Sequence, residues 1–356
     1  MKDKQKILVV GGGIVGAALA WSLARRGAAV TLLERERPAA GSTSRAFAWI
    51  NVSHGQPEPY RQLRHLAVEE WRCIEPQLPG LSIDWCGALT WTAAPGDTER
   101  FVAEHAAAGY GVRLLAAEEI RRLEPGLAEP PPVAAHAAGE GALDPIAATE
   151  ALLAAARRAG ATILTDVAAT ALRLAGERVV GVDTDKGPLE ADCVVLAAGV
   201  GSTALAAGAG IALPVEASPS ILVSLGRQDR RLLNGIVCGP ELEARQAGDG
   251  RLFAAEDPHP DRTPEAIAEG ALAALRRIVR DSGSVRVERV QVGLRPMPAD
   301  GLPILGFAPG RSGLYLAAMH AGITLGPVAA RLAAGEILDG REAPELAGCR
   351  IARFGS

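Results

Sequence analysis

Three glycines near the start of the chain are spaced in the way that a bound pyrophosphate requires. Gly11, Gly13 and Gly16 form the pattern G-x-G-x-x-G. Gly11 permits a tight turn, Gly13 leaves room where phosphates would approach the backbone, and Gly16 lets a helix pack closely on a strand. The N-terminus of that helix would offer free N–H groups and a partial positive charge to the phosphates.

The elements expected around these glycines are those that position a dinucleotide. An apolar strand is predicted at residues 7–10, a helix at 17–26 and a second strand at 29–33. The second strand ends at Glu34, where a carboxylate can hold ribose hydroxyls and would repel a 2′-phosphate. A glycine turn alone also occurs in other α/β proteins, but strand, helix, second strand and acid together favour dinucleotide binding. Which dinucleotide it is stays open at this point.

Composition excludes several classes of protein. The 356 residues are 48% hydrophobic but only 4% aromatic, and the net charge is −4 without a basic block, which disfavours nucleic acid as a partner. We expect no transmembrane segment, no signal peptide and no metal site. The five cysteines form no C-x-x-C pair, so we expect reduced thiols in a cytoplasmic protein; they are Cys73, Cys86, Cys193, Cys238 and Cys349.

Beyond the second strand, the pattern alternates between the nucleotide-binding unit and inserted pieces. Residues 41–58 are expected as an extended loop and residues 161–174 as one strand, followed by a β-meander at 179–196. Helices are predicted at 61–76, 97–107, 117–123, 145–158, 264–279 and 324–338, and a further strand at 314–318.

This order predicts an α/β protein of two domains. A Rossmann-type domain with a β-meander comprises residues 1–85, 140–212 and 290–356, and an inserted α+β domain on an antiparallel sheet comprises 86–139 and 213–289.

Three stretches of the chain are similar to the flavoprotein family of D-amino-acid oxidase, glycine oxidase and sarcosine oxidase. They are residues 7–35 with the loop 41–44, then 166–167 with 194–201, and finally 293–296, 300–303, 306 and 319–327. The third place contains Gly293-Leu294-Arg295-Pro296 and Met319-His320-Ala321-Gly322. The run 319–327 is the most specific, because a nicotinamide dehydrogenase has no reason to carry it. The resemblance implies FAD as the cofactor and oxidation of the C–N bond of a small amino acid or amine.

The resemblance also implies which residues contact FAD. Residues 322–325 would reach the flavin pyrimidine ring, and the start of the last helix there could stabilise negative charge on the reduced flavin. The full expected set is Gly11, Gly13, Ile14, Val15, Gly16, Glu34, Arg35, Ser42, Thr43, Ser44, Ala48, Trp49, Val167, Ala198, Gly199, Gly201, Gly322, Ile323, Thr324 and Leu325. Cys238 and Cys349 lie too far along the chain to match the cysteine that anchors flavin in sarcosine oxidases, so we expect non-covalent FAD.

Arg295 matches the family's carboxylate-binding arginine. A guanidinium offers a planar fork that suits a carboxylate, and Pro296 would stiffen the strand end that carries it. A surface salt bridge is the alternative for Arg295. His54 and His320 are further catalytic candidates, although His54 could be merely solvated and His320 could serve packing and hydrogen bonding. Because hydride transfer needs orientation and a neutral amine, we assign no general base.

Some features depart from the family pattern and leave rival functions open. The loop after His320 is two residues shorter than in glycine oxidase, and none of the three tyrosines lies between residues 213 and 290. The electron acceptor could be oxygen, or a quinone or partner protein in a dehydrogenase. The chain could also be a non-catalytic flavin-binding subunit of an amine-oxidising complex, or a homo-oligomer. Action on a modified base in RNA is disfavoured by the acidic balance.

Overall fold

A six-stranded sheet forms the centre of the nucleotide-binding part in the computed structural model, which describes residues 4–355. Five neighbouring strands are parallel to one another, and the edge strand β19 is antiparallel to its neighbour β20. The strands are apolar because helices or sheets cover both of their faces. The order is β19(Ile304–Phe307), β20(Leu314–Ala318), β13(Cys193–Leu196), β1(Lys6–Val10), β2(Ala29–Leu33) and β9(Thr162–Leu164).

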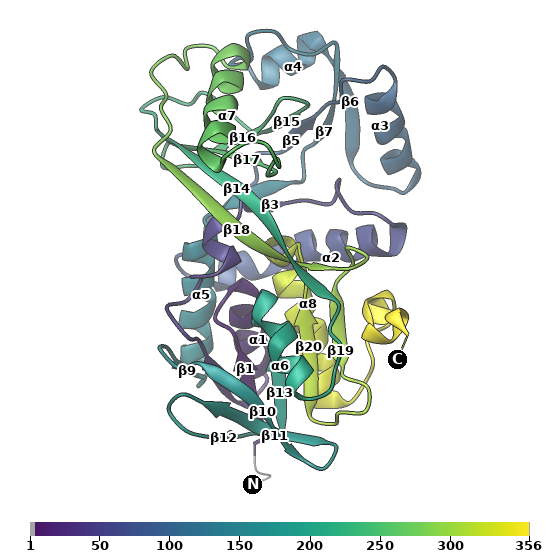
Figure 1. The fold of residues 1–356 in the computed structure, drawn as a ribbon. Coiled ribbons are helices and arrows are strands. Elements are labelled where there is room, and N and C mark those ends of the chain that lie inside the picture. The colour runs from purple at the N-terminus through teal and green to yellow at the C-terminus, as the bar shows by residue number, and fades with distance from the viewer. Residues whose placement is uncertain (1–3, 356) are drawn as a thin grey trace.

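Helices and a small sheet sandwich this central sheet (Figure 1). On one face α1(Ile14–Ala24) packs between α5(Pro145–Arg158) and α8(Gly322–Asp339), and α2(Glu58–Ile74) crosses α8. The other face meets α6(Ser202–Gly208) and a three-stranded meander, β10(Ala169–Ala175), β11(Arg178–Thr184) and β12(Leu189–Glu190). The strand, helix, second strand and acid predicted around Gly11 are therefore present.

An eight-stranded sheet forms the second part of the molecule, above the first in Figure 1. The helices α7(Pro264–Ile278) and α4(Ala117–Leu123) cover one of its faces, and α3(Asp97–Ala107) packs on its far edge. Its order is β18(Arg289–Pro298), β14(Val215–Arg227), β17(Arg251–Glu256), β16(Leu242–Gln246), β15(Ile236–Gly239), β5(Ala88–Thr90), β7(Val133–Ala137) and β6(Val112–Ala116). A short sheet of β3(Trp49–Ile50), β8(Gly141–Leu143) and β4(Ile83–Asp84) connects the two parts. The predicted α/β class with an inserted, largely antiparallel sheet is confirmed.

Two local predictions are wrong. Residues 161–174 are not one strand, because Asp166 adopts a φ of +56° and separates β9 in the central sheet from β10 in the meander. Such a φ cannot continue a strand, and periodicity alone does not reveal it. Residues 41–58 are not only an extended loop, since they contain the 3-10 turn η1(Ser42–Arg45) and β3.

The pairing of the long strand β18 does not follow the proposed domain division. It was expected with the nucleotide-binding domain from residue 290 onward, yet it pairs with β14 from Arg289 to Pro298. In Figure 1 β14 and β18 run together from the upper sheet down to the lower part. We keep the two-domain division as a proposal, with β18 assigned to the eight-stranded sheet. Among residues 4–355, no helix has the length and apolar character needed to cross a bilayer.

Candidate active site

One cavity of about 1490 Å³ connects the glycine-rich turn with the eight-stranded sheet. Glu34 from the nucleotide-binding part lines it, and so do Arg295 and Glu243 from the eight-stranded sheet and His320 before α8. All of the predicted cofactor residues line it except Gly16, Ser44 and Leu325. Those that do are Gly11, Gly13, Ile14, Val15, Glu34, Arg35, Ser42, Thr43, Ala48, Trp49, Val167, Ala198, Gly199, Gly201, Gly322, Ile323 and Thr324.

The three predicted residues outside the cavity have other positions. A Cβ on Gly16 would lie 1.9 Å from the carbonyl oxygen of Gly11, so this glycine serves the close helix–strand contact. The Ser44 hydroxyl donates to the carbonyl of Gly41 at 3.3 Å. Leu325 is fully buried in the core beneath α8.

The turn at Gly11 and Gly13 leaves an open cradle for phosphates. Gly11 has a φ of +111°, and a Cβ there would lie 2.5 Å from the carbonyl oxygen of Ala197. A Cβ on Gly13 would meet only the Thr43 hydroxyl, at 3.1 Å. The same hydroxyl accepts the N–H of Ile14 at 3.2 Å, since Gly13 offers α1 no side-chain cap. The loop that carries Thr43 thus binds one N–H at the N-terminus of α1 and leaves the space in front of the helix open.

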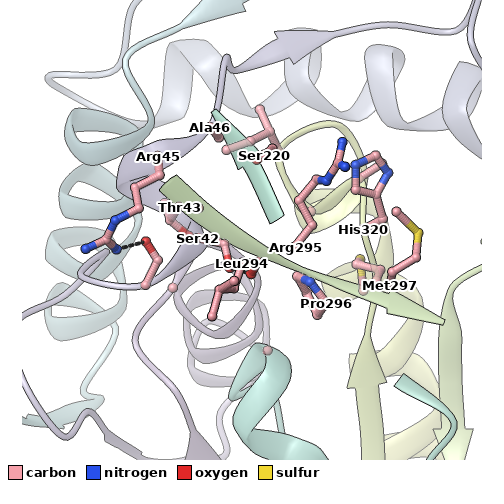
Figure 2. Close-up of a pocket in the computed structure, with 18 of the residues that line it drawn as sticks. Ser42, Thr43, Arg45, Ala46, Ser220, Leu294, Arg295, Pro296, Met297 and His320 are labelled. Carbon is pink, nitrogen blue, oxygen red and sulfur yellow. Dashed lines mark hydrogen bonds between the residues drawn. The ribbon is translucent and has the colours of Figure 1, made fainter. Parts of the chain in front are cut away.

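Glu34 has the geometry expected of a ribose-binding acid. Its carboxylate is fixed at the end of β2 by the N–H groups of Gly12, at 2.7 Å, and Glu36, at 2.9 Å. The Val167 N–H donates to the Glu34 carbonyl at 3.0 Å, which brings the chain after β9 beside it. Figure 2 shows the neighbouring segment, in which Ser42 and Thr43 approach β18 near Leu294. The Ser42 hydroxyl donates to the Leu294 carbonyl at 2.6 Å.

The far end of the cavity is formed by the segment around β3 and by the start of α8. Thr324, in the first turn of α8, donates its hydroxyl to the Trp49 carbonyl at 3.2 Å. Ala48 before it has a φ of +64°, which is unusual for a residue with a side chain. No side chain caps α8, so its first N–H groups are available to a bound anion or polarised carbonyl.

Buried Glu140 holds this segment in place. Its carboxylate accepts the N–H groups of Val52, at 2.8 Å, and Ser53, at 2.7 Å, and the Trp49 indole N–H at 2.9 Å. Burial raises the pKa of Glu140, while the two backbone donors oppose that shift. The side chain of Trp49 then packs edge-on against His54, with ring centroids 4.7 Å apart.

We therefore expect Glu140→Ala to destabilise the protein strongly. Three buried donors would lose their acceptor, and each unsatisfied group costs about 1–3 kcal/mol. The free energy of unfolding should fall by about 3 kcal/mol or more in urea titrations. Glu150→Ala, an exposed glutamate on α5, is the matched control and should change it by less than about 0.5 kcal/mol. Equal stability of the two variants would contradict the role of Glu140.

Arg295 projects from within β18, not from a strand end as the sequence suggested. One of its terminal nitrogens donates to the Ser218 hydroxyl at 3.1 Å, the Pro219 carbonyl at 2.9 Å and the Asp257 carboxylate at 3.0 Å. Its Nε is buried and has no hydrogen-bond partner in the part of the chain that the structure describes. In Figure 2 the guanidinium lies beside the His320 ring. Arg295 thus has free donor capacity inside the cavity.

Both histidines are neutral at physiological pH. Desolvation, with Arg64 and His105 nearby, lowers the pKa of His54 to about 4. Desolvation, with Arg295 and Arg64 nearby, lowers the pKa of His320 to about 4. Both rings line the cavity, but neither can serve as a charged group there or as an effective base near pH 7.

Several cavity residues were not predicted from the sequence. Arg64 on α2 is only 5% exposed and binds the Asn51 carbonyl at 3.0 Å and the Tyr60 hydroxyl at 2.9 Å, without a carboxylate partner. Arg45 follows the predicted serine–threonine loop and donates to the Gly41 carbonyl at 2.9 Å. Cys238 and Glu243 come from β15 and β16. Only Arg45 had a signal in the sequence, namely its place next to Ser44.

The site fits a flavin dinucleotide on its own geometry. An open glycine cradle, an acid 2.7 Å from the turn and an uncapped second helix line one continuous cavity. No cluster of metal-binding side chains occurs among the residues that the structure describes.

Comparison with known proteins agrees with this geometry. The bifunctional protein ThiO/ThiG of Synechocystis is 28% identical over 99% of this chain, which spans 55% of that longer protein. Glycine oxidase of Pseudomonas aeruginosa is 27% identical, over 95% of this chain and 96% of its own length. The crystal structure of glycine oxidase from Geobacillus kaustophilus superposes with a TM-score of 0.87 at 25% identity, covering 98% of this chain and 99% of that one.

A family description matches nearly the whole chain and confirms the resemblance drawn from the sequence. Residues 6–336 match the family described as DAO, FAD dependent oxidoreductase. This range includes the glycine turn, Arg295 and the start of α8. The chain therefore belongs to the DAO family of FAD-dependent oxidoreductases.

Proposed function

We propose that this protein oxidises the C–N bond of a small amino acid or related amine, with FAD bound non-covalently. The observation that carries this proposal is the position of Arg295. Its side chain lines the same cavity as the glycine cradle, and its buried Nε has no hydrogen-bond partner among residues 4–355. A carboxylate is the ligand that best suits such a planar cation.

The residues around Arg295 would bind and orient the substrate. Asp257, which pairs with Arg295 at 3.0 Å, is largely exposed, so a substrate carboxylate could replace it at little cost. When bound, FAD supplies the acceptor for the hydride that leaves the α-carbon. The imine then reacts with water to give a keto acid and an amine. His54 and His320 would shape the cavity as neutral groups, because their pKa values are lowered to about 4.

The non-covalent mode of binding makes a simple prediction. Cys238 does not match the anchoring cysteine of sarcosine oxidases, but it lines the cavity, so covalent attachment must be considered. Burial raises the pKa of the Cys238 thiol to about 12, which leaves it protonated and a poor nucleophile. Acid precipitation of the yellow protein should therefore release all flavin into the supernatant. A yellow pellet, and loss of that colour in Cys238→Ala, would contradict the proposal.

The activity is tested on the FAD-loaded protein under nitrogen. Glycine, sarcosine, L-proline and the D- and L-forms of alanine and lysine are added in turn, and the flavin absorbance near 450 nm is followed. At least one of them should bleach the flavin within seconds to minutes. Oxygen uptake compared with dye reduction then distinguishes an oxidase from a dehydrogenase. A protein that stays yellow with every amine would favour the non-catalytic alternative.

A further inference from the structure

Glu243 contributes a carboxylate to the cavity wall. It lies on β16, whose register places it opposite Cys238 on β15 and Ala255 on β17. All three residues line the cavity, and Glu243 is the charged member of this row. Its carboxylate makes no hydrogen bond or ion pair within residues 4–355. Glu243 is partly buried. A partly desolvated acid without a donor costs stability, which is typical of a group kept for a ligand.

Arg295 lies on the same face of the same sheet. Ala255 pairs with Leu222 on β14, which in turn pairs with Gln291 on β18. Arg295 follows Gln291 by four residues, and alternate residues of a strand share a face. Glu243 and Arg295 are close enough that the arginine lowers the pKa of the acid. The sheet therefore presents an anion and a cation to one cavity.

The groups around Glu243 leave it as the unpaired acid. Asp257 pairs with Arg295, and Glu256 has Arg262 as its neighbouring cation. Arg245, two residues along β16, donates instead to the Phe47 carbonyl at 2.7 Å. The cation beside Glu243 is Arg295, which is already ion-paired with Asp257. Negative charge at this end of the cavity therefore exceeds the positive charge that Arg295 provides.

We propose that Glu243 binds the substrate's amino group as an ammonium ion and accepts its proton, while Arg295 binds the carboxylate. The transferred proton passes from nitrogen to a carboxylate oxygen and leaves the amine neutral, as loss of a hydride from the α-carbon requires. This inference rests on the proposed function and adds a catalytic base to it. The substrate class is then a free amino acid, with an N–H to donate and a carboxylate.

The proposed proton transfer to Glu243 predicts how kcat/KM changes with pH. Burial, with Asp257 and Glu256 nearby, raises the pKa of Glu243 to about 7. Glu243 accepts a proton only when it is ionised, so kcat/KM should rise as the pH passes through about 7. In Glu243→Gln the amine must already be neutral in solution, so the rise should move toward the alkaline pKa of the free amino acid. His320→Asn should retain the rise near neutral pH.

The experiment compares Glu243→Gln with Glu216→Gln, an exposed glutamate of β14 outside the cavity. With the amino acid that bleaches the flavin fastest, kcat/KM at pH 7.5 should fall about 30-fold in Glu243→Gln, as for one lost charge-assisted hydrogen bond. Glu216→Gln should match the parent. A rising limb that stays near pH 7 in Glu243→Gln would overturn the proposal.

Titration with non-reacting and reacting ligands tests the role of Glu243 independently of the proposed oxidation. Glycine and acetate share a carboxylate, and only glycine has the ammonium group; both can be titrated by their effect on the flavin spectrum. Glu243→Gln should weaken glycine about tenfold and bind acetate as well as or better than the parent, whereas Arg295→Gln should weaken both. Equal effects of Glu243→Gln on both ligands would refute the role of Glu243. If no amine bleaches the flavin but glycine binding depends on Glu243, only the proposed oxidation fails.

We expect Glu243→Gln to fold as stably as the parent, so that a loss of activity would not result from unfolding. Because the pKa of Glu243 is raised in the folded state, its stabilising influence is present below its unfolded pKa and is lost as pH rises through about 7. At pH 8 the Glu243→Gln variant should therefore melt at or above the temperature of the parent. A residue that lowers stability yet raises activity serves function and not packing.

Discussion

Replacing Gly13 with aspartate is expected to give a folded protein that purifies without its yellow colour. The backbone can accept a Cβ there after a small shift, since the added atom would meet only the Thr43 hydroxyl, at 3.1 Å. The added carboxylate, however, would stand where the cradle opens toward a pyrophosphate. Two like charges at such short range repel by several kcal/mol in a partly buried site, so the affinity for FAD should fall at least about 100-fold.

Gly208→Asp is the matched control for this experiment. It makes the same change of charge at a glycine of α6 where a Cβ would meet nothing within 4 Å and which lies outside the cavity. FAD fluorescence quenching measures the affinity of both variants, and circular dichroism measures their folding. Tight FAD binding by folded Gly13→Asp would show that the dinucleotide does not lie against this turn.

Replacing Arg295 with leucine should have the largest effect on turnover. A bidentate guanidinium–carboxylate contact contributes two charge-assisted hydrogen bonds, each worth about 1.5–3 kcal/mol. Their loss should lower the rate of flavin bleaching at limiting amino acid by about 100- to 1000-fold. Lysine at position 295 should recover only part of this loss, since it keeps the charge without the planar fork.

Arg289→Leu tests whether any arginine of β18 would have the same effect. Arg289 is exposed at the start of the strand and outside the cavity, and its replacement should leave bleaching unchanged. FAD affinity should be unaltered in both variants. If Arg295→Leu bleaches as fast as the parent, the substrate carboxylate is held elsewhere, and the alternative of a surface salt bridge with Asp257 gains support.

Structural features that depend on residues close together in the sequence could be predicted from it. The helices α3, α4 and α5 occupy the residue ranges expected from their periodicity, and α5 begins after Asp144, whose side chain accepts the Ile146 and Ala147 N–H groups. The glycine turn and Glu34 were likewise readable, because the spacing of that motif directly reflects the turn it makes. Asp166 was missed because its positive φ has no signature in the periodicity.

Residues that act through contacts distant in sequence were less predictable. Glu140 reaches Val52 and Ser53 across 88 and 87 positions, and neither segment alone suggests the contact. Glu243 enters the cavity only because β16 pairs between β15 and β17. Cys238 likewise reaches the cavity wall only through the pairing of β15 in the sheet. Arg295 was predicted from its family motif. That its Nε has no hydrogen-bond partner among the described residues could be seen only in the structure.

The parallel pairing of β5 with β15 has a consequence for synthesis on the ribosome. Ala88 on β5 meets Ile236 on β15, and this contact joins the two halves of the eight-stranded sheet. The first half emerges early with β5 as an unprotected edge, which can associate with other nascent chains until its partner has been translated. Because so much chain separates the two strands, this closure should be slow, and chaperone dependence should concentrate on this edge.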